Sequence, residues 1–195
     1  AARIFDQVHV LNEGHFASRY FPGTGIWLAP FLMLGNPFAG QWLATVLVCV
    51  FVFLIGRELS CNGVGLLAGI LAALSPGLVL FGNLLLAHQP TLLGLGLFIY
   101  AFLRLQRLLD EPAADLPRVR YIAAVAVAAG LSGFGLAFAM LCRPMTAAGV
   151  GFPFGVWVAA WLIRHARRQS RVSAVIIGGF AIPLTVGFGI AAVYN

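Results

Sequence analysis

Four separated stretches of the sequence carry side chains that could bind an anion or transfer a proton. They hold Asp6, His9, Glu13, His15, Arg19 and Tyr20; Asn83, His88 and Gln89; Arg143; and Tyr194 and Asn195. Guanidinium groups form bidentate, charge-assisted hydrogen bonds with phosphate. No Ser-His-Asp arrangement and no metal-ligand spacing accompanies them, because His9 and His15 are six residues apart. The arginines beside apolar sequence therefore predict binding of a phosphate that is attached to a lipid.

Each of these side chains also has a structural interpretation. His88 could cap a helix beside Pro90, and Arg143 could hold a tight turn between two helices. The predicted spans bring all four stretches to the same side of the membrane, and this convergence favours a functional site.

The composition places those elements in a membrane. Hydrophobic residues make up 61% of the 195 residues, charged residues only 9%, and the mean hydropathy is +0.96. Soluble domains carry about 25% charged residues, so this chain cannot cover its surface with charge. It is predicted to be an all-α, polytopic membrane helix bundle.

Six apolar segments are long enough to cross a bilayer, which takes about 20 residues. They span residues 38–56, 63–84, 90–108, 120–141, 145–163 and 173–194. Ser75-Pro76 predicts a kink in the second segment. A shorter apolar helix is expected over 24–34, lying in or partly entering the interface with Trp27 as an aromatic anchor. Residues 1–23 then form a loop at the outer face, and 24–195 form the transmembrane domain.

The arginines set the predicted orientation. All twelve basic residues are Arg, and they lie between apolar runs instead of along one face, which argues against nucleic acid as a partner. Nine fall on one side of the alternating spans: Arg57, Arg104, Arg107, Arg118, Arg120, Arg164, Arg167, Arg168 and Arg171. Three (Arg3, Arg19 and Arg143) fall on the other. The side with nine is expected to be cytoplasmic, which puts all four chemically equipped stretches at the outer face.

Other patterns favour packing. Glycines such as those in "GVGLLAG" follow no strand, so close helix contact is preferred over a nucleotide-binding loop. The three cysteines lack metal-type spacing, and a structural disulfide is not expected. Because residues 1–23 are polar and outside with no span before them, we expect the sequence to be a fragment that lacks at least one upstream helix.

Four segments resemble the GT-C superfamily of membrane glycosyltransferases, in particular the dolichyl-phosphate-mannose protein mannosyltransferase-like group and its bacterial polyprenyl-phosphate-sugar-dependent relatives. The segments are "SRYFPGTGIWLAP", "VFLIGRELSCNGVGLLAGILAALSPGLVLFGNLLLAHQPTLL", "AFAMLCRPMTAAGVGFPFGVW" and the final "YN". They stand in the family's order. Departures occur at His88-Gln89, where many relatives have Asp or Ser-His, and at Phe21-Pro22-Gly23, where the family has Pro-Pro-Gly.

The resemblance implies transfer of a sugar from a polyprenyl-phosphate donor to an acceptor hydroxyl of a glycan, lipid or protein. It implies a substrate-binding role for Arg19, Tyr20, His88, Gln89, Arg143 and Asn195. The family's catalytic acid lies in the first outer loop, but only the isolated Asp6 and Glu13 are present there, so we expect that acid upstream and the fragment alone to be inactive. No cofactor is certain, and a divalent metal remains open.

Three other functions stay open. A lipid or solute transporter would also be polytopic, although its ionisable groups usually lie near the midplane. A lipid-linked polymer ligase would share the polyprenyl substrate. A membrane anchor, with 24–34 as a re-entrant packing segment, would leave the outer polar residues unexplained. We expect the protein to contact membrane lipids in a bacterial inner membrane, with its active face outward.

Overall fold

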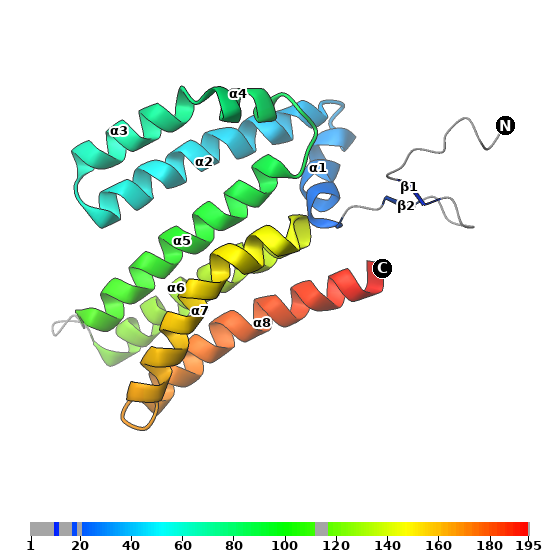
Figure 1. Ribbon diagram of the computed structural model, residues 1–195. Coiled ribbons are helices and arrows are strands. Elements are labelled where there is room, and N and C mark those ends of the chain that lie inside the picture. Colours follow the sequence, from blue (N-terminus) through cyan, green and yellow to red (C-terminus); the bar gives the residue numbers. More distant parts are fainter. Residues whose placement is uncertain (1–9, 12–16, 19–20, 112–116, 195) are drawn as a thin grey trace.

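The computed structural model describes residues 10–11, 17–18, 21–111 and 117–194. Two short strands, β1 (Val10–Leu11) and β2 (Ala17–Ser18), pair antiparallel. The rest of the described chain is mainly helical (Figure 1). The helices are α1 (Gly23–Met33), α2 (Pro37–Leu59), α3 (Asn62–Ala73), α4 (Pro76–Gly82), α5 (His88–Asp110), α6 (Arg118–Cys142), α7 (Pro144–His165) and α8 (Ser170–Tyr194).

Within the described residues, five helices are long and apolar enough to cross a membrane: α2, α5, α6, α7 and α8. The second of the six predicted spans, 63–84, is broken. Its two halves, α3 and α4, are bent by 55° at Leu74 and Ser75, where Pro76 begins α4. The expected kink is thus a full interruption, and the pair forms either one broken span or a re-entrant loop. The all-α, polytopic architecture predicted from the sequence is confirmed.

The short helix before the first span is also present, as α1. Its junction with α2 follows from the local sequence Gly35-Asn36-Pro37. Gly35 has a φ of 80°, a backbone conformation that glycine adopts without strain. Asn36 caps α2 by accepting a hydrogen bond from the Ala39 amide at 3.3 Å, and Pro37 occupies the first helical turn. The chain therefore turns sharply from α1 into the first long helix.

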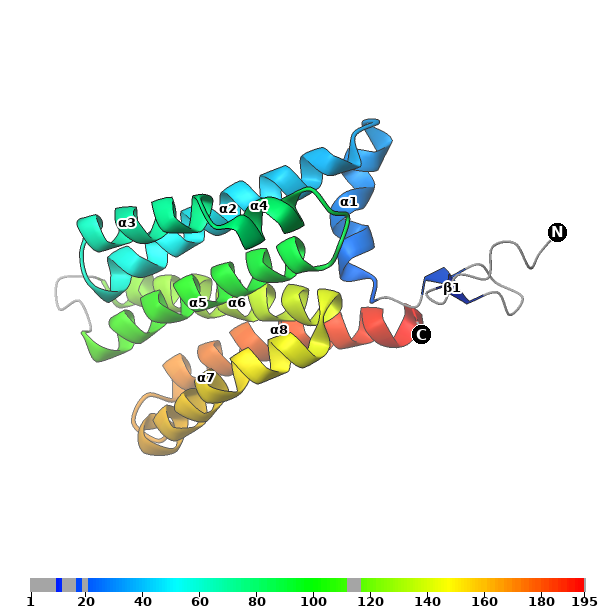
Figure 2. The ribbon, with the colours of Figure 1, turned by 45° about the horizontal axis from the view of Figure 1, so that its top comes forward.

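Helix α5 lies at the centre of the bundle, with α2 and α3 on one side and α6, α7 and α8 on the other (Figures 1 and 2). Its buried side chains contribute to all three apolar clusters: Leu93 packs with α2, Phe98 with α6 and α7, and Leu105 with α6, α7 and α8. Glycines permit the closest contacts. A Cβ on Gly94 would lie 2.8 Å from the carbonyl oxygen of Gly135, so α5 and α6 meet almost backbone to backbone.

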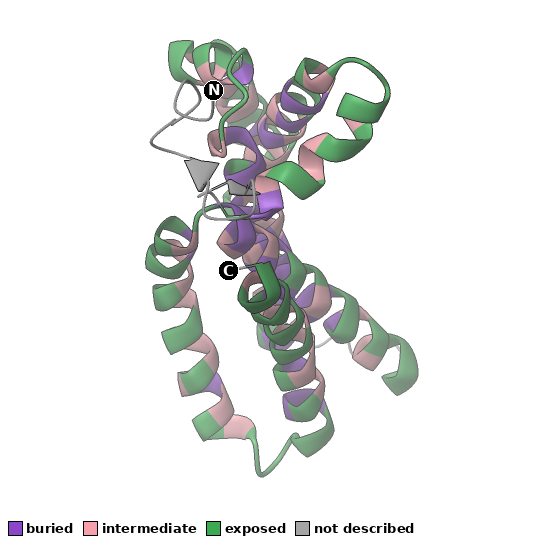
Figure 3. Cartoon of the chain, turned by 90° about the vertical axis from the view of Figure 1, so that its right-hand side faces the viewer, coloured by how far each residue is buried: buried purple, intermediate pink, exposed green. Residues whose placement is uncertain are grey.

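Exposed residues occupy much of the outside of this bundle (Figure 3), and many of them are large and apolar. Leu66, Phe152, Ile163 and Ile182 are among those that are more than half exposed. Such a surface is unfavourable in water and favourable against lipid. The protein is accordingly an integral, multi-pass membrane protein.

The two ends of the bundle differ in charge. The ends of α2, α5 and α7 and the starts of α3, α6 and α8 lie together at one end of the bundle (Figure 1). We call it the arginine-rich end because it carries the nine arginines that sequence analysis grouped together. The opposite end, the α1 end, holds α1, the α4–α5 turn, the α6–α7 turn and the end of α8. The alternation predicted from the spans is therefore present in the fold.

A carboxylate organises part of the arginine-rich end. Glu58 of α2 is only 5% exposed, and it accepts hydrogen bonds from Arg104 at 3.2 Å and Arg107 at 3.0 Å, both on α5. Arg57 lies 3.9 Å from the same carboxylate. Opposite charges compensate the burial of Glu58. This network joins α2 to α5 and gives three of the nine arginines a structural role.

Candidate functional site

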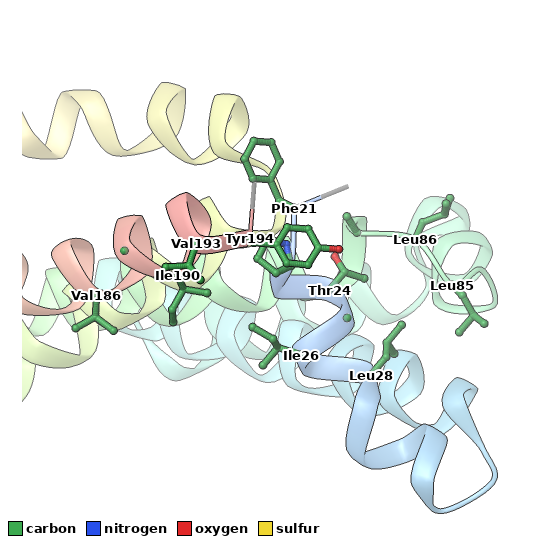
Figure 4. A pocket seen from close by; sticks show the side chains of 14 residues that line it. Phe21, Thr24, Ile26, Leu28, Leu85, Leu86, Val186, Ile190, Val193 and Tyr194 are labelled. Atoms are coloured by element: carbon green, nitrogen blue, oxygen red, sulfur yellow. The ribbon is translucent and has the colours of Figure 1, made fainter. Parts of the chain in front are cut away.

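A large hollow opens at the α1 end, and we call it the α1 groove. Its volume is about 940 Å³. Three segments that are far apart in the sequence form it: the start of α1, the α4–α5 turn and the end of α8 (Figure 4). The lining residues are Phe21, Pro22, Thr24, Gly25, Ile26, Leu28, Leu85, Leu86, Ala87, Val186, Gly189, Ile190, Val193 and Tyr194.

The lining is apolar except for a few groups. Thr24 and Tyr194 supply the side-chain hydroxyls of the lining, and Figure 4 shows both beside the first turn of α1. Ligand pockets usually measure about 300–1,000 Å³ and combine apolar walls with a few placed polar groups. The α1 groove is at the upper end of that range. Its chemistry suits an extended hydrocarbon chain better than a free sugar or a nucleotide.

Close packing against α6 fixes the start of α1. A Cβ on Gly23 would lie 2.6 Å from the carbonyl carbon of Leu141 and 2.8 Å from the sulfur of Cys142. Only glycine permits this approach, so the Pro-Gly pair highlighted by the sequence seats α1 on the end of α6. The groove wall formed by Phe21 and Pro22 is positioned by that contact.

Trp27 joins α1 to two neighbouring helices. Its indole N–H donates a hydrogen bond to the Gly40 carbonyl of α2 at 3.0 Å. Its ring packs against Phe31 and Phe138, with centroid distances of 5.6 and 6.2 Å. The anchoring at the membrane interface that the sequence predicted stays a prediction, and these contacts tie α1 to α2 and α6. Trp27 therefore holds the helix that lines the groove.

Two buried glutamines support the α4–α5 turn, which forms the groove wall opposite α8. Gln41 of α2 is fully buried, and its side-chain amide donates to the Leu86 carbonyl at 2.9 Å. Gln89 of α5 is also fully buried, and it donates to the Leu78 carbonyl of α4 at 2.9 Å. The α4–α5 turn has few regular hydrogen bonds of its own, so these side chains fix its course.

Gln89 was predicted to bind substrate. In the fold it lies outside the groove lining and joins α5 to α4 by its hydrogen bond to the Leu78 carbonyl. Gln41, which sequence analysis did not single out, has the equivalent role between α2 and the turn. Its signal was available as a single amide within the apolar run of α2, since a buried polar group needs a partner.

His88 and Arg143 both lie at the α1 end. His88 stacks on Phe81 with a centroid distance of 4.3 Å and an interplanar angle of 15°. Its Nδ1 atom is buried without a hydrogen-bond partner among the described residues. Arg143 is exposed between α6 and α7. Neither side chain lines the groove, although Ala87, the neighbour of His88, does.

The remaining predicted site residues, Asp6, Glu13, Arg19, Tyr20 and Asn195, lie outside the described residues. Two of their immediate neighbours in the chain are described and line the groove. Phe21 follows Tyr20, and Tyr194 precedes Asn195. The sequence thus identified the segments that form the groove, but it selected their polar residues, whereas the described lining is mainly apolar.

Metal binding receives no support from the described part of the chain. There, no group of three or more His, Cys, Asp or Glu side chains could hold a metal ion. Cys49, Cys61 and Cys142 are all free thiols.

Comparison with protein-family models, with curated proteins and with solved structures gave no match. The GT-C resemblance therefore stays a prediction that rests on the four quoted segments.

Proposed function

We propose that this chain belongs to a membrane glycosyltransferase that takes a sugar from a polyprenyl-phosphate donor and transfers it to an acceptor hydroxyl at the outer face of the membrane. The observation that carries the proposal is the α1 groove. It is a lipid-sized apolar hollow, and residues from three of the four segments that resemble the GT-C family line it, together with Val186, Gly189, Ile190 and Val193 of α8. In this proposal the hydrocarbon chain of the donor lies in the groove, and the α1 end faces outward.

The donor phosphate requires cations close to the groove. Arg143 is exposed beside the end of α6, on which the start of α1 is seated. Arg19 is two residues before the groove residue Phe21 in the sequence. We assign these two guanidinium groups to the lipid phosphate, and His88, which lies at the same end of the bundle, to a supporting role near the donor. A preorganised cation of this kind contributes roughly 3–4 kcal/mol of transition-state stabilisation.

The chemistry assigned to the site is direct displacement at the anomeric carbon. The acceptor oxygen forms the new bond to that carbon as the bond to the lipid phosphate breaks, and the configuration inverts. A carboxylate accepts the proton of the acceptor hydroxyl, while the cations take up the charge of the departing phosphate. Asp6 and Glu13 are the candidate carboxylates within this sequence.

The test is binding of a short-chain polyprenyl-phosphate sugar to the chain in lipid nanodiscs. A Cβ on Gly25 or Gly189 would meet nothing within 4 Å, and both residues line the groove. Gly25→Leu and Gly189→Leu should therefore fill the groove without a clash. Each is expected to weaken binding about tenfold or more, since several buried methylenes of the lipid would be displaced.

Gly178→Leu is the matched control, because Gly178 lies on α8, its Cβ also meets nothing within 4 Å, and it is not part of the lining. Arg143→Gln tests the phosphate contact separately: it should weaken binding of the phosphorylated lipid and leave binding of the polyprenol alcohol unchanged. Wild-type protein that binds no polyprenyl phosphate would refute the proposal and favour a transporter or a scaffold.

A further inference from the structure

A second pocket lies at the arginine-rich end, about 410 Å³ in volume, between the start of α6 and the start of α8. We call it the arginine pocket. Unlike the α1 groove, it is lined largely by polar side chains: Arg118, Tyr121, Arg168, Gln169, Ser170 and Arg171. It lies at the other end of the bundle from the α1 groove and has no part in the function proposed above.

The pocket gathers positive charge that no carboxylate of the described residues pairs with. Among the described residues, the ion pairs at this end all involve Glu58, which takes Arg57, Arg104 and Arg107. Arg118, Arg168 and Arg171 form no ion pair within that part of the chain. No carboxylate stands among the described lining residues. The three guanidinium groups repel one another, and an anion between them would relieve the repulsion.

Backbone groups add to the attraction for an anion. Helix α6 begins at Arg118, its N-cap is Pro117, and no side chain caps it. Helix α8 begins at Ser170, which lines the same pocket. The N-terminal ends of both helices therefore border the hollow, and each carries unpaired N–H groups and a partial positive charge. Guanidinium groups and helix N-termini together are the donor set that phosphate prefers.

The surroundings indicate where that phosphate comes from. Large apolar side chains are exposed on the same two helices within a few turns of the pocket, among them Val119 (79%), Val127 (60%) and Ile177 (53%). Such side chains face acyl chains in a membrane protein, whose lipid head groups lie level with the helix ends. We propose that the arginine pocket binds the head-group phosphate of an anionic phospholipid.

The alternative to a specific site is a non-specific attraction, in which the nine arginines together attract anionic lipid, as positively charged helix ends do. The fold supplies a matched control. Arg120, Arg164 and Arg167 lie at the same end, are exposed, and do not line the pocket. Replacing the three pocket arginines or the three control arginines by glutamine removes the same charge. The two triple variants should therefore differ in lipid binding only if the pocket is a specific site.

The experiment measures lipid adducts by native mass spectrometry of the purified chain, titrated with phosphatidylglycerol or phosphatidylcholine of equal chain length. The wild type is expected to retain phosphatidylglycerol preferentially. The R118Q/R168Q/R171Q variant should lose that preference by about tenfold or more, whereas R120Q/R164Q/R167Q should keep most of it. Equal loss in both variants, or no preference in the wild type, would overturn the proposal.

A competition experiment and a pair of single variants complete the test. An excess of inorganic phosphate should fail to displace the bound phosphatidylglycerol; displacement would identify a free-phosphate site and overturn the lipid assignment. If the pocket triple variant aggregates, the single variants Arg118→Gln and Arg120→Gln give the same comparison. Arg118→Gln should reduce the preference and Arg120→Gln should not, and the reverse order would contradict the proposal.

Discussion

Substitution of Gln41 tests how a single buried amide shapes the α1 groove. Gln41→Met keeps the length of the side chain and removes the hydrogen bond to the Leu86 carbonyl. That carbonyl belongs to the turn whose residues Leu85, Leu86 and Ala87 form one wall of the groove. The change therefore acts on the groove through its support and not through a contact with the ligand.

The magnitude follows from two opposing terms. Losing the 2.9 Å hydrogen bond and leaving the Leu86 carbonyl without its partner costs roughly 1–3 kcal/mol, and hydrogen bonds between membrane helices lie near the lower end of that range. The substitution also removes the Gln41 Oε1 atom, which is buried and has no partner among the described residues. Its removal offsets part of the cost, so we expect a net destabilisation of about 1 kcal/mol.

The assay combines reversible unfolding in mixed micelles with hydrogen–deuterium exchange. Unfolding should show the loss of about 1 kcal/mol, and exchange should accelerate in residues 84–87 more than in α2 itself. Affinity for polyprenyl phosphate should fall several-fold.

Thr45→Val is the control, because the hydrogen bond of the Thr45 hydroxyl, at 2.9 Å, goes to the Gln41 carbonyl within the same helix and not to the α4–α5 turn. It should change stability by less than about 0.5 kcal/mol. Unchanged exchange at 84–87 in Gln41→Met would refute the idea that this amide positions the groove wall.

Three other predictions concern the scaffold. Gly133→Ala should destabilise the bundle by about 1–3 kcal/mol, because its Cβ would clash with the backbone at Gly179, whereas Gly130→Ala on the same helix meets nothing within 4 Å and should be neutral or slightly stabilising. Glu58→Gln should lower the free energy of unfolding by about 1.5–3 kcal/mol at low salt and by less at high salt, measured by denaturant titration. Cys61 should be the first thiol to react with a maleimide, with a rate that rises at lower pH than for an ordinary thiol, because the backbone N–H groups of Val64 and Gly63 lower the pKa of its exposed side chain.

Each of these has a result that would contradict it. Equal stability of the two glycine variants would show that α6 and α8 separate easily at that contact. A Glu58→Gln effect independent of salt would argue against charge as its cause. In intact cells, labelling of Cys61 by a membrane-impermeant maleimide would place the arginine-rich end outside and reverse the proposed orientation.

The helical architecture could be predicted because it depends on local properties of the sequence. The length of the apolar runs gives the spans, and the positions of Arg57, Arg104 and Arg118 at their ends give the alternation. Pro76 marked the interruption of the second span, but sequence alone could not give the 55° bend, because the neighbouring helices set the direction in which the chain continues.

The site was predicted only in outline, since its geometry depends on contacts between distant segments. Gln89 was predicted to bind substrate and Trp27 to anchor α1 at the membrane interface, and in the fold each donates a hydrogen bond to the backbone of a neighbouring helix. Whether a polar side chain faces a ligand or another helix depends on the rotation of its helix, which single-sequence periodicity does not fix when a helix is apolar all round. Conversely, Gly25 and Gly189 carry no chemical signal, yet they leave open space in the groove.

The most direct test of the central claim is photocrosslinking. A polyprenyl-phosphate sugar with a diazirine in its hydrocarbon chain would be added to the protein in nanodiscs, and the labelled peptides would be identified by mass spectrometry. The proposal predicts labels concentrated in residues 21–28, 84–87 and 186–194, competed more strongly by unlabelled polyprenyl phosphate than by polyprenol at the same concentration. Labels spread evenly over the exposed apolar faces, including Leu66 and Phe152, and indifferent to the competitor, would contradict it.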